Sequence, residues 1–298
     1  MGCCCSRRFF EEENGTVRYQ LINGRRYHNL SSSVYFLAND DEEVYRLSRY
    51  HNAIKDIWVG LFHSPVEEKL RQGARVIDIG CGSGIWILDV ARQYPNSNFV
   101  GIDISPILPT EGLPSNVTFI QYNVLDGLPF EDSSFDLVHQ KFMVCAFTEV
   151  QWEEKVIPEL IRLTRPDGWI EILEADAILI SDGTVTRRIA KAFHDFLVSK
   201  GINPSIGKEI PRIFENSNMF SEIKHRQKTI KLGKRHGESG EETLRFCISG
   251  LSSARGTLST SMNLMPEHYD ALIETMIIET EKCSTDFIQH RICAHKRI

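Results

Sequence analysis

The sequence lacks several features that would assign it to other classes of protein. It has no run of 18 or more apolar residues and no apolar stretch typical of a signal peptide, so neither a membrane-spanning helix nor secretion is expected. It also lacks an excess of basic residues: the formal net charge is −6, which predicts no general attraction to nucleic acid. We therefore expect a cytoplasmic protein without a nucleic-acid partner.

Cysteine patterns typical of metal sites are absent as well. The eight cysteines form no Cys-x-x-Cys motif and no Cys/His ligand pattern. Five of them are scattered through the chain, as is usual for reduced thiols of a cytosolic protein: Cys81, Cys145, Cys247, Cys283 and Cys293. The sequence therefore predicts no metal site.

The other three cysteines are consecutive near the N-terminus. Met1-Gly2-Cys3-Cys4-Cys5-Ser6 fits the N-myristoylation pattern, with Gly2 exposed after removal of Met1. One myristoyl chain binds a membrane only marginally, so a second acyl chain is needed, and Cys3 and Cys4 are suitable palmitoylation sites. We expect residues 1–30 to be a lipidated, flexible tail that attaches the protein to a membrane. The alternative is a tail whose cysteines have no role.

A glycine-rich turn is the central motif of the chain. The apolar run Val76–Ile79 predicts a buried strand, the segment 80–84 follows with glycine at every second position, and a helical pattern begins at once. In doubly wound α/β folds such a turn lets the backbone approach a nucleotide at a helix N-terminus. The spacing is not the dinucleotide Gly-x-Gly-x-x-Gly, because Ile85 takes the place of the third glycine. Asp78 before the turn suits a ligand with an ammonium and a sulfonium group.

Strands and helices alternate after this turn, which predicts a parallel sheet. The next predicted strand, 98–103, ends in Asp103, about twenty residues beyond the glycines, where such folds bind ribose hydroxyls. Further strands are predicted at the following ranges: 117–122, 135–141, 169–174, 222–232 and 287–294. We expect a doubly wound, mostly parallel seven-stranded sheet with helical additions at both ends.

The sequence predicts one domain, residues 31–298, with its core at 71–180. A helix that begins after Asp40 carries an apolar stripe, which indicates packing in the core. In a second interpretation this helix and Tyr35 lie over the cofactor. The region 181–285 reads as a helical cover in which the residues that select a substrate would lie.

Several stretches together resemble one family, the class I S-adenosylmethionine (SAM) dependent methyltransferases. More narrowly, the chain resembles the fungal branch that includes methyltransferase-like regulators of secondary metabolism. The narrow resemblance covers roughly residues 27–180 and rests on five segments: Tyr27-His28-Asn29, residues 35–47, residues 123–130, His139-Gln140-Lys141 and Pro166-Asp167-Gly168.

The resemblance implies SAM as the cofactor and a contact role for ten positions: Asp78, Gly80, Cys81, Gly82, Ser83, Asp103, Ile104, Asn123, Val124 and Gln140. Those before residue 84 would hold the methionine end of SAM, and Asp103 would bind the ribose. Gln140 would lie beside the sulfonium, and the remaining three beside the adenine.

The predicted reaction is methyl transfer from SAM to an unidentified acceptor, which is a protein, a lipid or a small molecule. Because the sulfonium is already activated, positioning can supply most of the catalysis. His139, Glu174 and His63 are candidate bases, but none stands out, so the catalytic residues stay unknown. The alternative is a regulatory binding protein that keeps the methyltransferase fold without strong catalysis. An NAD-dependent oxidoreductase is disfavoured by Ile85.

Overall fold

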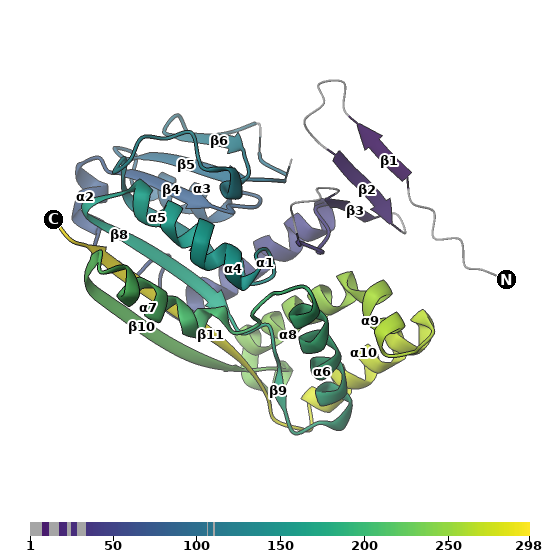
Figure 1. Cartoon of the computed structure of the whole chain (residues 1–298). Coiled ribbons are helices and arrows are strands. Elements are labelled where there is room, and N and C mark those ends of the chain that lie inside the picture. The colour runs from purple at the N-terminus through teal and green to yellow at the C-terminus, as the bar shows by residue number, and fades with distance from the viewer. Residues whose placement is uncertain (1–7, 12–17, 23–24, 29–33, 106, 110) are drawn as a thin grey trace.

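A large twisted sheet forms the centre of the protein. The computed structural model describes residues 8–11, 18–22, 25–28, 34–105, 107–109 and 111–298 (Figure 1). The strands of the sheet lie in the order β10-β11-β8-β7-β4-β5-β6, with β9 paired to β11. Their bounds are β4 (Arg75–Ile79), β5 (Asn98–Asp103), β6 (Val117–Gln121), β7 (Phe135–Lys141), β8 (Thr164–Ala175), β9 (Ile180–Ser181), β10 (Phe220–Lys231) and β11 (Thr285–Lys296).

The sheet is parallel from β8 to β6 and antiparallel at β11 and β10. The predicted doubly wound, mostly parallel seven-stranded sheet is therefore confirmed, and the two-residue strand β9 is an addition to it. Because parallel strands run in one direction, the carboxyl ends of β4 to β7 meet at one edge, where ligands of such sheets bind.

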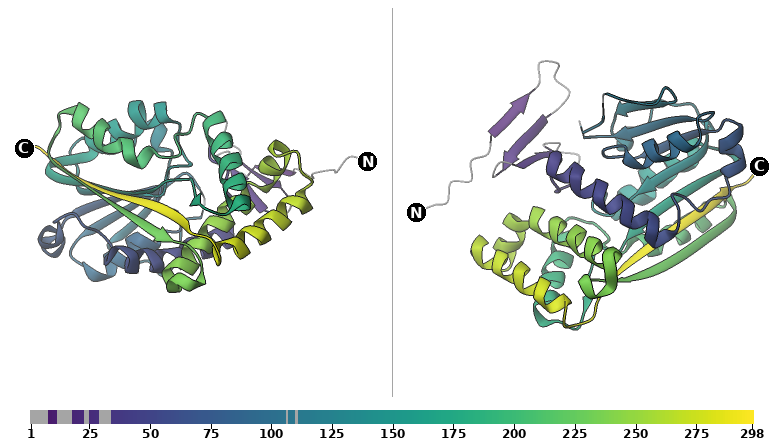
Figure 2. Two further views of the ribbon diagram at one scale, coloured as in Figure 1. Left: turned by 90° about the horizontal axis from the view of Figure 1, so that it is seen from below. Right: turned by 180° about the vertical axis from the view of Figure 1, so that it is seen from behind.

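Helices cover both faces of the sheet (Figures 1 and 2). One face carries α1 (Asp41–Trp58), α2 (Glu67–Gln72) and α3 (Ile85–Gln93); the other carries α4 (Glu149–Gln151), a π-helical turn (Trp152–Val156), α5 (Ile157–Leu163) and α7 (Ile206–Ser217). Alternate side chains of β4 point to the two faces of the sheet. Val76 packs with Trp86 of α3, whereas Ile77 packs with Leu160 of α5. Strands buried on both faces explain the continuous apolar runs in the sequence.

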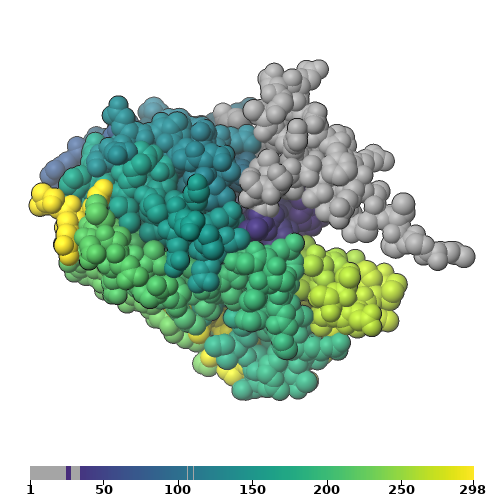
Figure 3. All heavy atoms as spheres, in the orientation of Figure 1, coloured from purple at the N-terminus to yellow at the C-terminus, as the bar shows by residue number. Residues whose placement is uncertain are grey.

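A group of helices, which we call the helical lobe, stands beside the sheet. It consists of α6 (Thr184–Ser199), α8 (Gly237–Ser253), α9 (Arg255–Ser261) and α10 (Pro266–Thr280), with the 3₁₀ turn Lys234–His236 leading into α8. Ile189, Leu258 and Tyr269 are buried between these helices. Figure 3 shows α9 and α10 as a projecting yellow-green body, and α8 packs along α1. The lobe therefore packs beside the sheet near the edge at which ligands of such sheets bind.

The N-terminal segment differs from its prediction. Within residues 7–30, expected to be a flexible spacer, the structure has three antiparallel strands, β1 (Arg8–Glu11), β2 (Arg18–Ile22) and β3 (Arg25–His28). The sequence Asn23-Gly24 between β2 and β3 was interpreted as part of a flexible spacer, although this dipeptide also favours a hairpin turn. Arg25 also pairs with the Asp40 carboxylate at 2.7 Å, which ties β3 to the start of α1.

Gly2, Cys3 and Cys4, the predicted lipidation sites, lie outside the described residues. Within the part of the chain that is described, no helix has the length and apolar character needed to cross a membrane.

Candidate functional site

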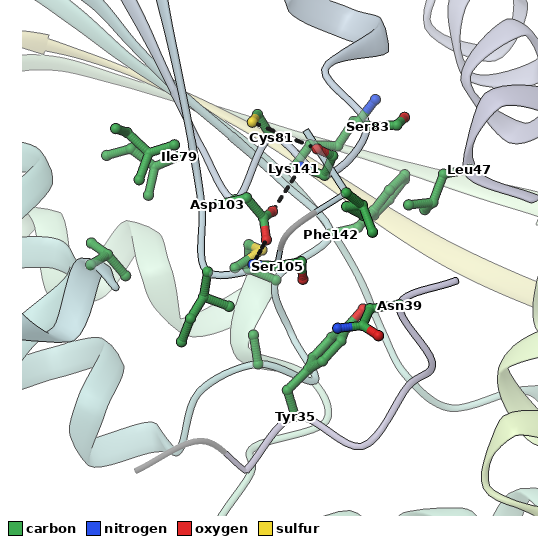
Figure 4. Close-up of a pocket in the computed structure, with 18 of the residues that line it drawn as sticks. Tyr35, Asn39, Leu47, Ile79, Cys81, Ser83, Asp103, Ser105, Lys141 and Phe142 are labelled. Carbon is green, nitrogen blue, oxygen red and sulfur yellow. Dashed lines mark hydrogen bonds between the residues drawn. The ribbon is translucent and has the colours of Figure 1, made fainter. Parts of the chain in front are cut away.

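A pocket opens at the carboxyl ends of β4, β5, β6 and β7. The glycine turn after β4, the end of β5 and the 3₁₀ turn Val124–Asp126 (η1) form its floor. Leu47, Tyr50 and His51 of α1 form one wall, and Tyr35 and Asn39 of the segment before α1 face the strand ends (Figure 4). The first interpretation of α1 is confirmed, because Tyr50, Ile54 and Trp58 are buried in the core, and the helix also lines the pocket.

The glycine turn needs its glycines for backbone and packing reasons. Gly80, Gly82 and Gly84 have φ values of 72°, 56° and 72°, in the left-handed region that other residues avoid. A Cβ on Gly80 would lie 2.4 Å from the Met143 sulfur, and one on Gly84 would lie 2.4 Å from the Phe119 ring. A Cβ on Gly82 would meet only Leu47, at 3.5 Å, across the pocket. Gly82 therefore keeps the backbone open towards a ligand.

Asp103 is fixed at the mouth of this turn. Its carboxylate accepts hydrogen bonds from the backbone N–H groups of Gly82 and Ser105, both at 2.7 Å (Figure 4). Burial raises the pKa of Asp103, and the two backbone hydrogen bonds oppose that rise by favouring the ionised form. An oriented carboxylate on the pocket wall is a suitable acceptor for the two hydroxyls of a ribose.

A hydroxyl and an ammonium also line the pocket. The buried Ser83 Oγ at the start of α3 has no hydrogen-bond partner among the described residues, and Lys141 at the end of β7 lines the same pocket. Burial lowers the pKa of Lys141 to about 8, so the side chain is mostly protonated at neutral pH. Its Nζ lies 3.5 Å from Nδ1 of His51. A helix N-terminus with a free hydroxyl and a cation fits a ligand carboxylate.

His51 stays neutral beside Lys141. Burial and, secondly, the Lys141 charge lower the pKa of His51 to about 4. Its Nε2 lies 3.0 Å from the Asp89 carboxylate of α3, so Nε2–H donates to Asp89 and Nδ1 is free to accept from Lys141. This chain of contacts connects α1, α3 and β7 and holds Lys141 at the pocket wall.

Apolar side chains surround the remaining end of the pocket, beside η1. Ile104 and Val124 provide flat aliphatic surface of the kind that packs on an adenine ring. Asn123 caps η1 by accepting the Leu125 N–H at 3.1 Å, so only one lone pair of its carbonyl is left for an adenine amino group. The donors, acceptors and apolar surfaces of the pocket thus fit the parts of SAM.

Two predicted contact residues are not on the pocket wall. The carboxylate of Asp78 is buried and lies 2.7 Å from Nδ1 of His139, whose ring stacks on Trp86. Gln140 is fully buried, and its amide has no hydrogen-bond partner among the described residues. The contacts of Asp78 and Gln140 with SAM stay predictions, since neither side chain is among those that line the pocket. The other eight predicted positions all line the pocket.

None of the three candidate bases lines the pocket either. His139 is held by Asp78, and Nε2 of His63 lies 2.7 Å from the carbonyl oxygen of Trp58. Glu174 accepts the backbone N–H groups of Met143 and Val144 at 2.6 and 3.1 Å. Their roles in the structure are therefore to hold neighbouring segments in place.

Sequence reasoning did not assign Lys141 or Asn39 to the site. A lysine at the end of a predicted strand was a usable signal for Lys141, because strand ends carry ligand-binding residues in this fold. Asn39 lies before the first helix and its position depends on contacts with Arg26, which no local pattern indicates.

Comparisons with known proteins agree with this geometry. A methyltransferase-domain family model matches residues 76–168. The methyltransferase str3 of Strobilurus tenacellus is 33% identical over 193 residues, which are 63% of this chain and 67% of that protein. The secondary metabolism regulator laeA of Monascus pilosus is 35% identical over 157 residues, 52% of this chain and 41% of its own length.

A solved structure supports the fold. The cyclopropane-fatty-acyl-phospholipid synthase-like protein of Lactobacillus casei superimposes with a TM-score of 0.51 at 17% identity, covering 83% of this chain and 90% of that one. The chain therefore belongs to the class I SAM-dependent methyltransferases, and SAM is its cofactor. Within that family it resembles fungal methyltransferases and the laeA-type regulators.

Proposed function

We propose that SAM lies in this pocket with its ribose on Asp103, its carboxylate near Ser83 and Lys141, and its adenine beside η1. The observation that carries the proposal is the fixed Asp103 carboxylate, which the glycine turn presents to the pocket at 2.7 Å from Gly82 N. The unpartnered Ser83 hydroxyl supports the placement of the SAM carboxylate at this residue.

When bound, SAM supplies a methyl group on a positively charged sulfur. The residues of the chain bind and orient SAM: Asp103 fixes the ribose, Lys141 neutralises the carboxylate, and the rings of Tyr50 and Phe142 line the same pocket. Aromatic faces attract a cation without competing as nucleophiles. An acceptor needs a lone pair directed at the methyl group, and none of the three predicted bases lines the pocket.

Calorimetric titration of SAM into the full chain and its Asp103→Ala variant tests this proposal. We expect saturable binding by the native chain and a loss of about 30-fold or more in affinity in the variant, or about 2 kcal/mol. Circular dichroism confirms that the variant is folded. A folded native chain that does not bind SAM, or a variant that binds equally well, would contradict the proposed site.

We also propose that the protein acts at a membrane surface through acylation of Gly2 and palmitoylation of Cys3 or Cys4. The support is the sequence pattern of the first six residues and the need for two acyl chains in stable anchoring. Full-length protein with a C-terminal tag should sediment with membranes. The Gly2→Ala variant and the double variant Cys3→Ser/Cys4→Ser should both move to the soluble fraction. Equal distribution of all three proteins would refute the anchor.

A regulatory role is the second candidate function. Similarity to the regulator laeA of Monascus pilosus favours it, as does the absence of the predicted bases from the pocket wall. Incubation with labelled SAM and a cell extract distinguishes the two functions: label transferred by the native chain but not by Asp103→Ala supports the enzyme, and SAM binding without transfer supports the regulator.

A further inference from the structure

A second cavity adjoins the cofactor pocket. Tyr35, Leu47 and Phe142 line both, so the two spaces meet at these three side chains. The second cavity extends away from the sheet into the helical lobe, and its walls come from α6, α8 and the segment after β8. A molecule in this cavity would therefore have one end beside the cofactor.

The walls of the second cavity are apolar and rich in aromatic rings. Four phenylalanines line it: Phe142 after β7, Phe193 of α6, Phe246 of α8 and Phe287 of β11. Ala175, Ala190 and Leu179 also line the cavity. Such a surface stabilises an apolar ligand by burial and a ring-bearing ligand further by stacking or edge-to-face contact.

Among the described residues that line this cavity, Arg46 alone is charged, and its charge is paired. Arg46 binds both carboxylate oxygens of Glu43, and its guanidinium lies 4.4 Å from the centre of the Phe246 ring. The side chains of Arg46 and Glu43 are 10% and 2% exposed, so the pair is shielded from water. The two thiols on the wall, Cys145 and Cys247, have pKa values raised by burial to about 12 and are uncharged at neutral pH. The described residues of this wall therefore offer no unpaired charge to an ionic group.

We infer that this second cavity is the acceptor site and that it takes an uncharged, ring-bearing apolar small molecule. The nucleophilic atom of the acceptor lies at the Tyr35–Leu47–Phe142 junction, and its apolar body lies between α6 and α8. The inference rests on the proposed SAM site, because the nucleophilic atom can react at this junction only if the methyl group of SAM faces it. It excludes anionic groups from the part of the molecule that fills the cavity, since these would bring unpaired negative charge against the phenyl rings.

Gly250 of α8 provides a way to fill the cavity without disturbing its walls. It lines the cavity, and a Cβ built on it meets no atom within 4 Å. Gly256 of α9 also has no atom within 4 Å of its Cβ position, but lies outside both pockets. Gly250→Phe and Gly256→Phe are therefore matched variants with the same chemical change.

The probe is N-phenyl-1-naphthylamine, an uncharged aromatic amine whose fluorescence rises in apolar surroundings. Titrated into the full chain saturated with S-adenosylhomocysteine, it should bind at a single site. Gly250→Phe should weaken probe binding by about 20-fold or more, and Gly256→Phe should leave it within about threefold of the native chain. Both variants should bind SAM as the native chain does.

The 8-sulfonate of the same probe tests the charge requirement, because it adds one negative charge to the same rings. We expect the sulfonate to bind at least about tenfold more weakly than the neutral probe. Equal binding of the two probes, both sensitive to Gly250→Phe, would overturn the assignment to uncharged molecules.

Two other results would overturn the site itself: probe binding that is unaffected by Gly250→Phe, or probe binding that S-adenosylhomocysteine displaces. In either case normal SAM titrations would leave the proposed cofactor site standing. Failure of SAM to bind the native chain would instead remove the proposed function.

Discussion

The cofactor pocket and the acceptor cavity are adjacent, yet they are built by different means. The cofactor pocket uses strand ends, a turn with left-handed glycines and backbone N–H groups, together with Asp103 and Lys141. The acceptor cavity uses the faces of helices α6 and α8 and contains almost only carbon surface. Backbone geometry gives directional contacts to one particular ligand, whereas apolar helix faces give a shape that small side-chain changes can alter. The difference implies a fixed cofactor and an adaptable acceptor.

The Arg46–Glu43 pair joins the two pockets, and breaking it should have the largest effect. Glu43 lines the cofactor pocket and Arg46 the acceptor cavity. Arg46→Met leaves a buried carboxylate without its partner, so we expect the free energy of unfolding to fall by about 3–5 kcal/mol. Urea denaturation measures it. The double variant Glu43→Gln/Arg46→Met should recover most of the loss, and a double variant as unstable as the single one would contradict this explanation.

Gly82→Val should affect the cofactor pocket alone. The side chain projects from the turn towards Leu47, and it also strains a residue with φ of 56°. We expect SAM affinity to fall by more than about 30-fold, while N-phenyl-1-naphthylamine affinity changes by less than about threefold.

Gly112→Val is the control for this strain, because Gly112 has a φ of 66°, no atom within 4 Å of its Cβ position and no place in either pocket. If Gly112→Val weakened SAM binding as much as Gly82→Val, backbone strain rather than blockage of the pocket would explain the loss.

Glu174 supports the junction of the pockets, since it holds Met143 of one wall and Val144 of the other. Burial raises its pKa from 4.5 to about 8. The folded state therefore binds this proton more tightly than the unfolded state. Its contribution to stability is complete below pH 4.5 and is lost as the pH rises towards 8, by at most about 1.4 kcal/mol per pH unit.

Glu174→Gln should flatten this part of the stability profile, because glutamine does not titrate and keeps one acceptor oxygen. Denaturation curves at several pH values between 5 and about 8 measure the slope. A variant with the same slope as the native chain would show that another group causes it.

Lys141→Met should have the smallest effect and should again be confined to the cofactor. Removing one cation near the SAM carboxylate should weaken SAM by about fivefold, or about 1 kcal/mol, with more loss at low salt. Lys141→Arg keeps the charge and should stay closer to the native affinity in the same titration. Equal loss in both variants would indicate a steric rather than an electrostatic role.

The sequence predicted features of the cofactor pocket better than features of the acceptor cavity. Strand–turn–helix order and glycine spacing predicted the fold, and Asp103 was placed on the pocket wall, because these features depend on residues close together in the chain. No helix was predicted between residues 202 and 221, where the structure has α7 with Ile210 and Phe214 buried in the core. The contact of Asp78 with His139 was not predicted, because the two residues are 61 positions apart on neighbouring strands.

Local sequence patterns specify the class of the protein. Apolar runs that alternate with helical patterns specify the sheet. Glycines at every second position specify a turn that only residues without a Cβ can form. Tertiary structure alone decided which polar groups face the cofactor and where an acceptor can lie. The acceptor cavity collects side chains from α1, α6, α8 and β11, separated by up to 252 residues between Tyr35 and Phe287 (287 − 35). No local pattern encodes such a wall, because burial and charge pairing depend on neighbours that only the folded chain brings together.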